Sequence, residues 1–479
     1  MGILNRLTKL APQGKFFRDI LALAGGTTIG QLLVIAASPL LTRLYTPTDF
    51  GLLAIFSSSL GILSVAVSLR YEFAIPIAKS NEEAKSLLVL SLLLVLFSSV
   101  VVGVAVVFWG GSFADWVNAP RLESLLWLLP VGLFFYGALQ AINYWYTRVK
   151  GFSRLGVAKT LQSAGQILFQ LLGGFASAGS LGLVGGQVVG RFVSTIYLLP
   201  TLRTNLRAIS LEKVRHVIVR YKKFPLYTAA ASLVNVLGTQ APAIMFAKLF
   251  SSEIAGLFSL TVRILSLPAA LIGQAIGQAL YPRLAEKDAE VNGASGLIGE
   301  VAMILLIIAF PTFTFIGAYG PPLFSLVFGS EWKAAGLYAA YLSPWLLIAF
   351  ISSPLSMFVF VKEKQGTAFA LTLYETILRI GSIWIGKFTG APECAVALYS
   401  FAGIIISVVY IGWIFYLSKL SLLQWAALRQ NYFFTAVAVL FLVALLARSG
   451  GAFSAGISLL LLTAHFWYAL RRYGRMLYA

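Results

Sequence analysis

The chain has 479 residues, of which 59% are hydrophobic and only 11% charged, and its formal net charge is +19. A water-soluble protein of this length carries far more polar surface, so the composition excludes a soluble domain and predicts a membrane protein. The single cysteine, Cys394, excludes an intramolecular disulfide, and His216 and His465 are too far apart for a zinc-type spacing.

About fourteen apolar stretches follow one another between residues 20 and 470. Each has the length of ~20 residues that a helix needs to cross ~30 Å of hydrocarbon. The basic N-terminal residues lead into the first stretch without an obvious cleavage site, which predicts a retained first helix. The predicted spans are 20–41, 50–69, 86–108, 123–146, 156–177, 181–199, 225–247, 254–281, 296–319, 335–360, 366–386, 392–417, 431–447 and 452–470.

The loops between these spans differ sharply in positive charge. The two termini and the loops on their side hold 27 Lys and Arg residues, whereas the loops on the other side hold 6. Because basic loops stay in the cytoplasm, this asymmetry predicts a multi-pass membrane protein with both termini cytoplasmic. The net charge is therefore mostly a topology signal, and the basic soluble face of a nucleic-acid-binding protein is missing from the sequence.

Two halves of the chain carry similar landmarks at an offset of roughly 205–215 residues. Short turns follow the first span of each half (41–56 and 246–261) and the third span (110–120 and 321–336). Six spans in each repeat predict two lobes related by an axis along the membrane normal, with a substrate cavity between them. The predicted organisation is an N-lobe at 1–199, a basic cytoplasmic linker at 200–224, a C-lobe at 225–417 and two extra peripheral helices at 418–479.

Polar and charged residues recur inside the spans. Arg263, Arg191 and Arg379 fall within apolar stretches, where a charge costs ~2.5–3.5 kcal/mol or more unless it faces protein or water. Glutamines at helical spacing form stripes on several spans, as a water-filled cavity requires. These features predict a cationic cavity for an anionic substrate. The candidate binding residues are Arg263, Arg379, Arg191, Gln274, Gln278, Gln166, Gln170, Asn143 and Gln31.

Simpler structural roles compete with this interpretation. Single amides in membrane helices often only bond neighbouring helices, and Glu375 with Arg379 at i, i+4 can be a structural ion pair. Glu375 is also the candidate for proton coupling, since its protonation would release Arg379. Four residues beside the predicted cytoplasmic span ends, Arg70, Glu72, Arg148 and Lys150, are candidates for a mouth that attracts a phosphorylated substrate, or serve topology and lipid contact alone.

The loop motifs resemble those of a known family. LTRLYTPTDFGLLAIF with SLRYEFAI, YTRVKGFSRLGVAKTLQSAGQILFQLLGG, and above all the stretch 221–286 are similar to Wzx-type oligosaccharide flippases. This family belongs with the multidrug and toxin extrusion proteins to one exporter superfamily. The resemblance covers the first twelve spans and carries little signal in the last two.

The resemblance implies a fold of two six-helix lobes that alternate between inward-open and outward-open V shapes. It implies a substrate of undecaprenyl-diphosphate-linked oligosaccharide, flipped outward for O-antigen, exopolysaccharide or capsule synthesis, with the polymerase and chain-length machinery as partners. It assigns the matching positions Arg70, Glu72, Arg148 and Arg263 to the family motifs. It also implies no cofactor, with coupling to protons or sodium left open.

Other functions fit less well. A multidrug or cation exporter uses buried carboxylates, but the predicted first and seventh spans have none in their interior. A membrane polymerase or glycosyltransferase needs carboxylates on long loops, whereas the chain has four aspartates, no D-x-D and no P-loop pattern. A scaffold without transport activity stays open. The sequence leaves undetermined the sugars carried, the coupling ion, the oligomeric state, the role of the last two spans and the source organism.

Overall fold

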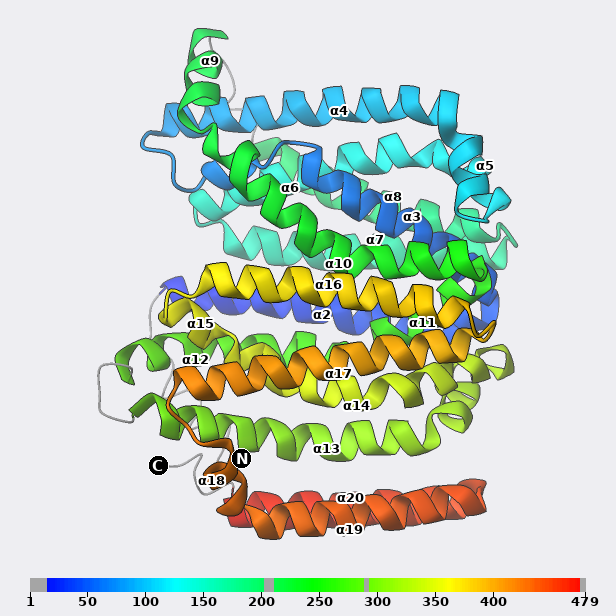
Figure 1. Ribbon diagram of the computed structural model, residues 1–479. Helices are drawn as coiled ribbons and strands as arrows, with labels where there is room; N and C mark the ends of the chain where they lie inside the picture. The colour runs from blue at the N-terminus through cyan, green and yellow to red at the C-terminus, as the bar shows by residue number, and fades with distance from the viewer. Residues whose placement is uncertain (1–14, 202–210, 288–292, 474–479) are drawn as a thin grey trace. The chain divides into compact units, whose positions relative to one another are not determined.

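The computed structural model describes residues 15–201, 211–287 and 293–473, which are almost entirely helical (Figure 1). The contacts divide the chain into two compact units, residues 1–256 (unit 1) and 257–479 (unit 2). The helix α10 belongs with unit 1, where it packs along α3 through a hydrogen bond from Ser58 Oγ to Gln240 Oε1 of 3.2 Å. The lobe and linker boundaries predicted from the repeat stay a prediction.

Unit 1 is a bundle of long helices joined by short turns. Its elements are α2 (Lys15–Leu44), α3 (Pro47–Ala66), η1 (Tyr71–Ala74), α4 (Asn81–Trp116), η2 (Pro120–Leu122), α5 (Glu123–Leu126), α6 (Leu128–Arg148), α7 (Phe152–Phe175), α8 (Ser180–Leu198), η3 (Leu199–Thr201), α9 (Leu211–Arg220), η4 (Phe224–Thr228) and α10 (Ala229–Leu249). The next helix, α11 (Ser252–Leu265), crosses the division between the units.

Capping hydrogen bonds explain why the connection between α2 and α3 is a tight turn. Thr46 caps α3 by accepting from the backbone N–H of Asp49 at 3.3 Å, and the Asp49 carboxylate accepts from the N–H of Thr46 at 3.0 Å. Pro47 follows the cap, where its missing N–H costs nothing. The neighbouring Tyr45 is almost fully buried and donates its hydroxyl to the carbonyl of Gln170 in α7 at 2.5 Å.

Small residues let α7 and α8 approach closely. A Cβ added to Gly182 would lie 2.3 Å from the Tyr45 hydroxyl and 3.1 Å from the Cα of Gly173. No side chain fits between these backbones, which is the usual way in which membrane helices pack without a hydrophobic driving force. The glycine pairs of the two helices, at 173–174 in α7 and 185–186 in α8, therefore serve packing.

Unit 2 contains several helices that are interrupted. Its elements after α11 are η5 (Ala269–Gly273), α12 (Gln274–Lys287), α13 (Gly293–Phe328), η6 (Ser330–Trp332), α14 (Lys333–Leu355), α15 (Met357–Val361), α16 (Gln365–Lys387), α17 (Pro392–Leu417), α18 (Leu422–Ala427), α19 (Gln430–Ser449) and α20 (Gly451–Tyr473). Pro268 lies in the break after α11, and η5 is a π-helical turn. Proline and π-turns are the usual causes of such breaks.

The prediction of an all-α polytopic membrane protein is confirmed. Every predicted span coincides with helix, and among the described residues 11 helices, or up to 12 with the bent pair at residues 120–148, are long and apolar enough to cross a membrane. Two of the fourteen predicted spans fail this test. The polar side chains of α7 lower its hydropathy, and the predicted span 254–281 is divided into α11, η5 and α12.

The two helices expected outside the repeat form a pair, α19 and α20, side by side in Figure 1. Thr435 of α19 and His465 of α20 share a hydrogen bond of 3.2 Å, and Tyr319 of α13 contacts Ser458 of α20 at 2.9 Å. These polar contacts lie among buried aromatic side chains, so α19 and α20 are fixed to unit 2 through α13.

Candidate functional site

Unit 1 holds a guanidinium deep among its helices. Arg191 on α8 donates to the carbonyl of Gln187 at 3.2 Å and lies 5.1 Å from the ring centroid of Tyr136 on α6. The Gln187 amide oxygen in turn accepts from Ser57 of α3 at 3.0 Å. Within the described part of unit 1, Arg191 has no carboxylate within ion-pair distance, so its charge is stabilised by π-electrons and amide dipoles alone.

A second cation in this region, Lys159, was missed in the sequence analysis, which counted it with the loop after the fourth span. The structure places Lys159 two turns inside α7, half-buried and within electrostatic reach of Arg191. Its spacing to Gln162, Gln166 and Gln170 puts it on the same helix face as the glutamine stripe. This shared helix face with the glutamines was the sequence signal that could have identified Lys159 as an interior cation.

The predicted amides of unit 1 differ in what they contact. Gln170 is 2% exposed and donates its amide to the carbonyl of Leu183 at 2.9 Å, so it joins α7 to α8. Gln166, Gln31 and Asn143 are half-buried, on α7, α2 and α6. Gln170 thus has the helix-joining role that its sequence context left open. The other three keep part of their side-chain surface exposed, and their binding of a substrate stays a prediction.

Arg263 is a cation of unit 2 that lies within a predicted span. It lies in the last turn of α11, five residues before Pro268, and is half-buried. Among the residues that the structure describes, its guanidinium has neither an ion pair nor a hydrogen bond to a side chain. Gln274 and Gln278, expected on the same face, have side chains that lie outside the described residues, so their predicted role stays a prediction.

Arg379 and Glu375 form the ion pair that their spacing predicted. The distance from Arg379 Nη2 to Glu375 Oε1 is 2.7 Å, on one face of α16. The guanidinium also lies 4.1 Å from the ring of Trp345 on α14 and 5.2 Å from that of Tyr399 on α17. Arg379 Nε is buried without a hydrogen-bond partner. The guanidinium is therefore held by two rings and one carboxylate, with a donor still available.

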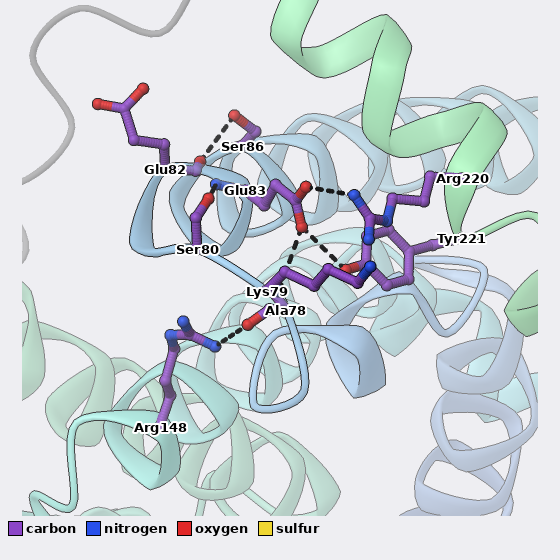
Figure 2. A network of polar contacts seen from close by, with 9 residues as sticks. All are labelled: Ala78, Lys79, Ser80, Glu82, Glu83, Ser86, Arg148, Arg220 and Tyr221. Atoms are coloured by element: carbon purple, nitrogen blue, oxygen red, sulfur yellow. Dashed lines mark hydrogen bonds and ion pairs between the residues drawn. The ribbon is translucent and has the colours of Figure 1, made fainter.

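The four predicted mouth residues lie at one end of unit 1, where α3 ends, α4 begins and α9 packs; we refer to it as the α9 end. Arg148, at the end of α6, donates Nη1 to the carbonyls of Ile75, Pro76 and Ala78 at 3.0, 3.2 and 2.8 Å. Its Nε and Nη2 donate to the side-chain oxygen of Asn81 at 3.3 and 3.2 Å. Figure 2 shows the guanidinium pointing at the loop before α4. Lys150 is exposed, with φ of 56°.

Arg70 and Glu72 are buried, contrary to what an open mouth would suggest. They are 7% and 0% exposed and lie 3.6 Å apart, with Arg70 in a left-handed backbone conformation (φ 62°). Ser68 donates its hydroxyl to Glu72 at 2.5 Å. Burial raises the pKa of Glu72, although the Ser68 hydrogen bond and Arg70 act in the other direction. A strained backbone and an incompletely bonded pair are features found at functional sites; whether this pair serves the substrate stays a prediction.

The helix α9 is attached to the start of α4 by opposite charges. Arg220 pairs with Glu83 at 2.6 Å, and the Tyr221 hydroxyl donates to the same carboxylate at 3.1 Å (Figure 2). Lys213 of α9 pairs with Glu82. Burial and the Glu83 carboxylate together raise the pKa of Tyr221. The apolar side of α9 packs with Val217 on a buried cluster around Trp145. The most basic segment of the sequence, 200–224, therefore has a partly structural role, because its charged residues attach α9 to the start of α4.

Replacement of Arg148 tests whether its hydrogen bonds to the loop before α4 stabilise the α9 end. We expect Arg148→Ala to destabilise the protein by about 1–3 kcal/mol, because it leaves several carbonyls and the Asn81 amide without a donor. Arg148→Lys should restore only part of the loss, since a lysine cannot reproduce the fork of donors. Thermal unfolding in detergent measures both. Exposed Lys150→Ala is the control, and equal midpoints for Arg148→Ala and wild type would contradict the structural role.

The fold places the chain in a known class. The inward closed form of the lipid II flippase MurJ superposes with a TM-score of 0.77 at 13% identity, covering 95% of this chain and 99% of that one. An inward-facing multidrug resistance MATE transporter of the MOP superfamily gives a TM-score of 0.65 at 17% identity, covering 86% and 99%. At such identities the likeness shows the fold alone: the two-lobe, all-helical fold of MOP-superfamily transporters.

The sequence comparisons identify the family. A family model described as polysaccharide biosynthesis protein matches residues 40–337, which is more than half of the chain. The chain belongs to this polysaccharide biosynthesis family, which confirms the family prediction made from the loop motifs. The lipopolysaccharide biosynthesis protein WzxC of Escherichia coli (strain K12) is 21% identical over 164 residues, and the match spans 34% of this chain and 33% of WzxC.

Proposed function

We propose that this chain is a flippase, not an enzyme, that moves undecaprenyl-diphosphate-linked oligosaccharide repeat units from the cytoplasmic to the outer leaflet of a bacterial inner membrane. The units would serve surface polysaccharide synthesis, such as O-antigen, exopolysaccharide or capsule. Family membership and the transporter fold support translocation of a lipid-linked saccharide. The specific headgroup, the cytoplasmic position of both termini and movement by alternating access are parts of this proposal.

The proposal rests mainly on one observation: several cations inside the helix bundle have no carboxylate partner. Lys159 and Arg191 in unit 1 and Arg263 in unit 2 lie on helices of the membrane bundle, and among the described residues none has an acidic partner. Each such charge costs ~2.5–3.5 kcal/mol or more at the bilayer centre unless it faces protein or water. An anionic substrate headgroup would supply the missing counter-charge, and a diphosphate offers several oxygens to a guanidinium fork.

The membrane potential supports movement in the proposed direction. A diphosphate diester carries about two negative charges, and moving one charge across 100 mV is worth ~2.3 kcal/mol, so outward movement releases about 5 kcal/mol. The obstacle is the passage of phosphates and sugar hydroxyls through hydrocarbon. Cations and half-buried amides such as Gln166 and Asn143 would replace water around the headgroup while the lipid tail stays in the bilayer.

Proton coupling is a further part of the proposal. Protonation of Glu375 would remove the carboxylate that holds Arg379 and leave its guanidinium free for a phosphate. The aromatic rings of Trp345 and Tyr399 would keep the freed side chain in place. No cofactor is needed in this scheme. The polymerase and chain-length machinery are the expected partners downstream.

Cation or drug export is the competing function on this fold. Such exporters need an interior carboxylate that is free to bind a cation. Glu375 is already paired with Arg379 at 2.7 Å, and the buried Glu72 lies 3.6 Å from Arg70. The remaining interior charges named above, those of Lys159, Arg191 and Arg263, are positive. The charge balance therefore favours an anion.

The proposal is tested in cells that lack this chain, by measuring the amount of lipid-linked oligosaccharide and the leaflet that its glycan faces. We expect undecaprenyl-diphosphate-linked units to accumulate facing the cytoplasm, with loss of surface polysaccharide. Units that reach the outer leaflet but stay unpolymerised would instead show that the chain acts as a polymerase or a scaffold.

A further inference from the structure

A long apolar groove lies in unit 1, away from the interior cations. It has a volume of 480 Å³ and is lined by residues of α3, α4, α5, α6 and α10. Along α4 it extends from Val102 to Trp116, which is about 21 Å at ~1.5 Å per residue. The volume falls within the ~300–1,000 Å³ typical of ligand sites. The groove is therefore large enough for an extended hydrocarbon chain.

The groove ends in a cationic and aromatic cluster. Trp116 lines its end farthest from the α9 end, and Lys248 of α10 places its ammonium 3.7 Å from the centre of that ring. In the described chain, Lys248 has no carboxylate within ion-pair distance. Lysine and tryptophan at a helix end are the residues that meet lipid headgroups. This end of the groove therefore combines a positive charge with a surface suited to the headgroup region.

The side of the groove carries one polar group without a partner. Ser59 of α3 is 8% exposed, lines the groove, and has a hydroxyl without a hydrogen-bond partner. Apart from the indole N–H groups of its tryptophans, this hydroxyl is the one polar side-chain group in the described lining. Buried hydroxyls normally find an acceptor. The rest of the described lining is apolar, which suits a hydrocarbon chain.

We propose that this groove binds an anionic phospholipid, with its phosphodiester at Lys248 and one acyl chain along α4. One lysine matches the single negative charge of a phosphodiester such as that of phosphatidylglycerol. At about 21 Å the groove is longer than the ~15 Å that one leaflet contributes to a ~30 Å hydrocarbon layer, so an acyl chain of one leaflet fits along it. The proposal concerns a structural or regulatory lipid, and it holds whether or not the chain translocates saccharides.

The test uses the full-length protein purified in mild detergent, titrated with phosphatidylglycerol or phosphatidylcholine and analysed by native mass spectrometry. Wild type should bind phosphatidylglycerol about fivefold more tightly, since one lysine near a headgroup contributes ~1 kcal/mol. Lys248→Ala should abolish this preference. Ala105→Trp, which fills the groove from α4, should weaken the binding of both lipids.

A matched control is available in unit 2. Lys387 lies 5.7 Å from the ring of Trp384 at the end of α16, so Lys387→Ala removes a similar lysine–tryptophan pair and should leave the lipid preference unchanged. An unchanged preference in Lys248→Ala would overturn the proposal even if Ala105→Trp failed to fold. Displacement of phosphatidylglycerol by an equimolar polyprenyl diphosphate would also overturn it, since the occupant would then be the transported lipid class.

Discussion

Arg263→Glu should abolish outward movement of the lipid-linked saccharide while leaving the protein in the membrane. Arg263 has no carboxylate partner in the described chain and lies in the last turn of α11, before the break that contains Pro268. Removal of one partner of a buried charge pair costs ~2–5 kcal/mol, which is about thirtyfold or more in affinity. Reversal of the charge would add repulsion of the diphosphate. The measurement is surface polysaccharide together with lipid-linked precursor in cells that produce the variant.

Two further variants separate this role from a loss of folding. Arg263→Lys keeps the charge but loses the bidentate fork, so it should retain part of the activity. Arg283→Glu reverses an exposed charge on the neighbouring α12 and should export normally. Normal export by Arg263→Glu at wild-type protein levels would rule out Arg263 as a contact of the headgroup.

Glu375→Gln should make translocation insensitive to pH. The variant reproduces the neutral, protonated carboxyl, so Arg379 would be free at every pH instead of only after proton uptake. If proton uptake frees Arg379 to bind the headgroup, wild type should be faster at pH values where Glu375 is protonated, and the variant should keep one rate throughout. The measurement is the initial rate of flipping in proteoliposomes across a pH series.

The surroundings of Arg379 provide the control for this prediction. Trp345→Leu removes the ring 4.1 Å from the guanidinium but keeps the carboxylate. It should lower the rate and leave the shape of the pH profile unchanged. A pH profile for Glu375→Gln that follows that of wild type would show that the ion pair is structural, the alternative that its i, i+4 spacing left open.

Local sequence signals predicted much of the fold. The TPTD motif indicated a turn after the first span, and in the structure Thr46 and Asp49 cap α3 there. Hydropathy located helix at every predicted span because apolar length alone decides whether a helix can cross a membrane. It could not show that Pro268 and a π-turn interrupt the helix after Arg263, because such breaks leave the mean hydropathy unchanged.

The candidate site was less predictable because it depends on three-dimensional contacts. The i, i+4 spacing of Glu375 and Arg379 predicted their ion pair, but nothing in the sequence showed that Trp345, on a different helix, lies over the guanidinium. Arg148 was a candidate for attracting substrate or for topology and lipid contact, and nothing in the sequence showed that it donates to carbonyls 70–73 positions earlier in the chain. Lys159 lies within the predicted span 156–177, but its charge was counted with those of the preceding loop because it is close to the start of that span.

The most direct test of the central claim uses the purified chain in proteoliposomes that contain a polyprenyl-diphosphate oligosaccharide labelled on its sugar. With the label initially confined to one leaflet, we measure how fast it becomes accessible to a glycosidase that reaches only the other leaflet. We predict transfer by the wild-type chain that is lost in Arg263→Glu and preserved in Arg283→Glu. Label that stays in its original leaflet with the wild-type chain, or transfer at the same rate with Arg263→Glu, would contradict the account.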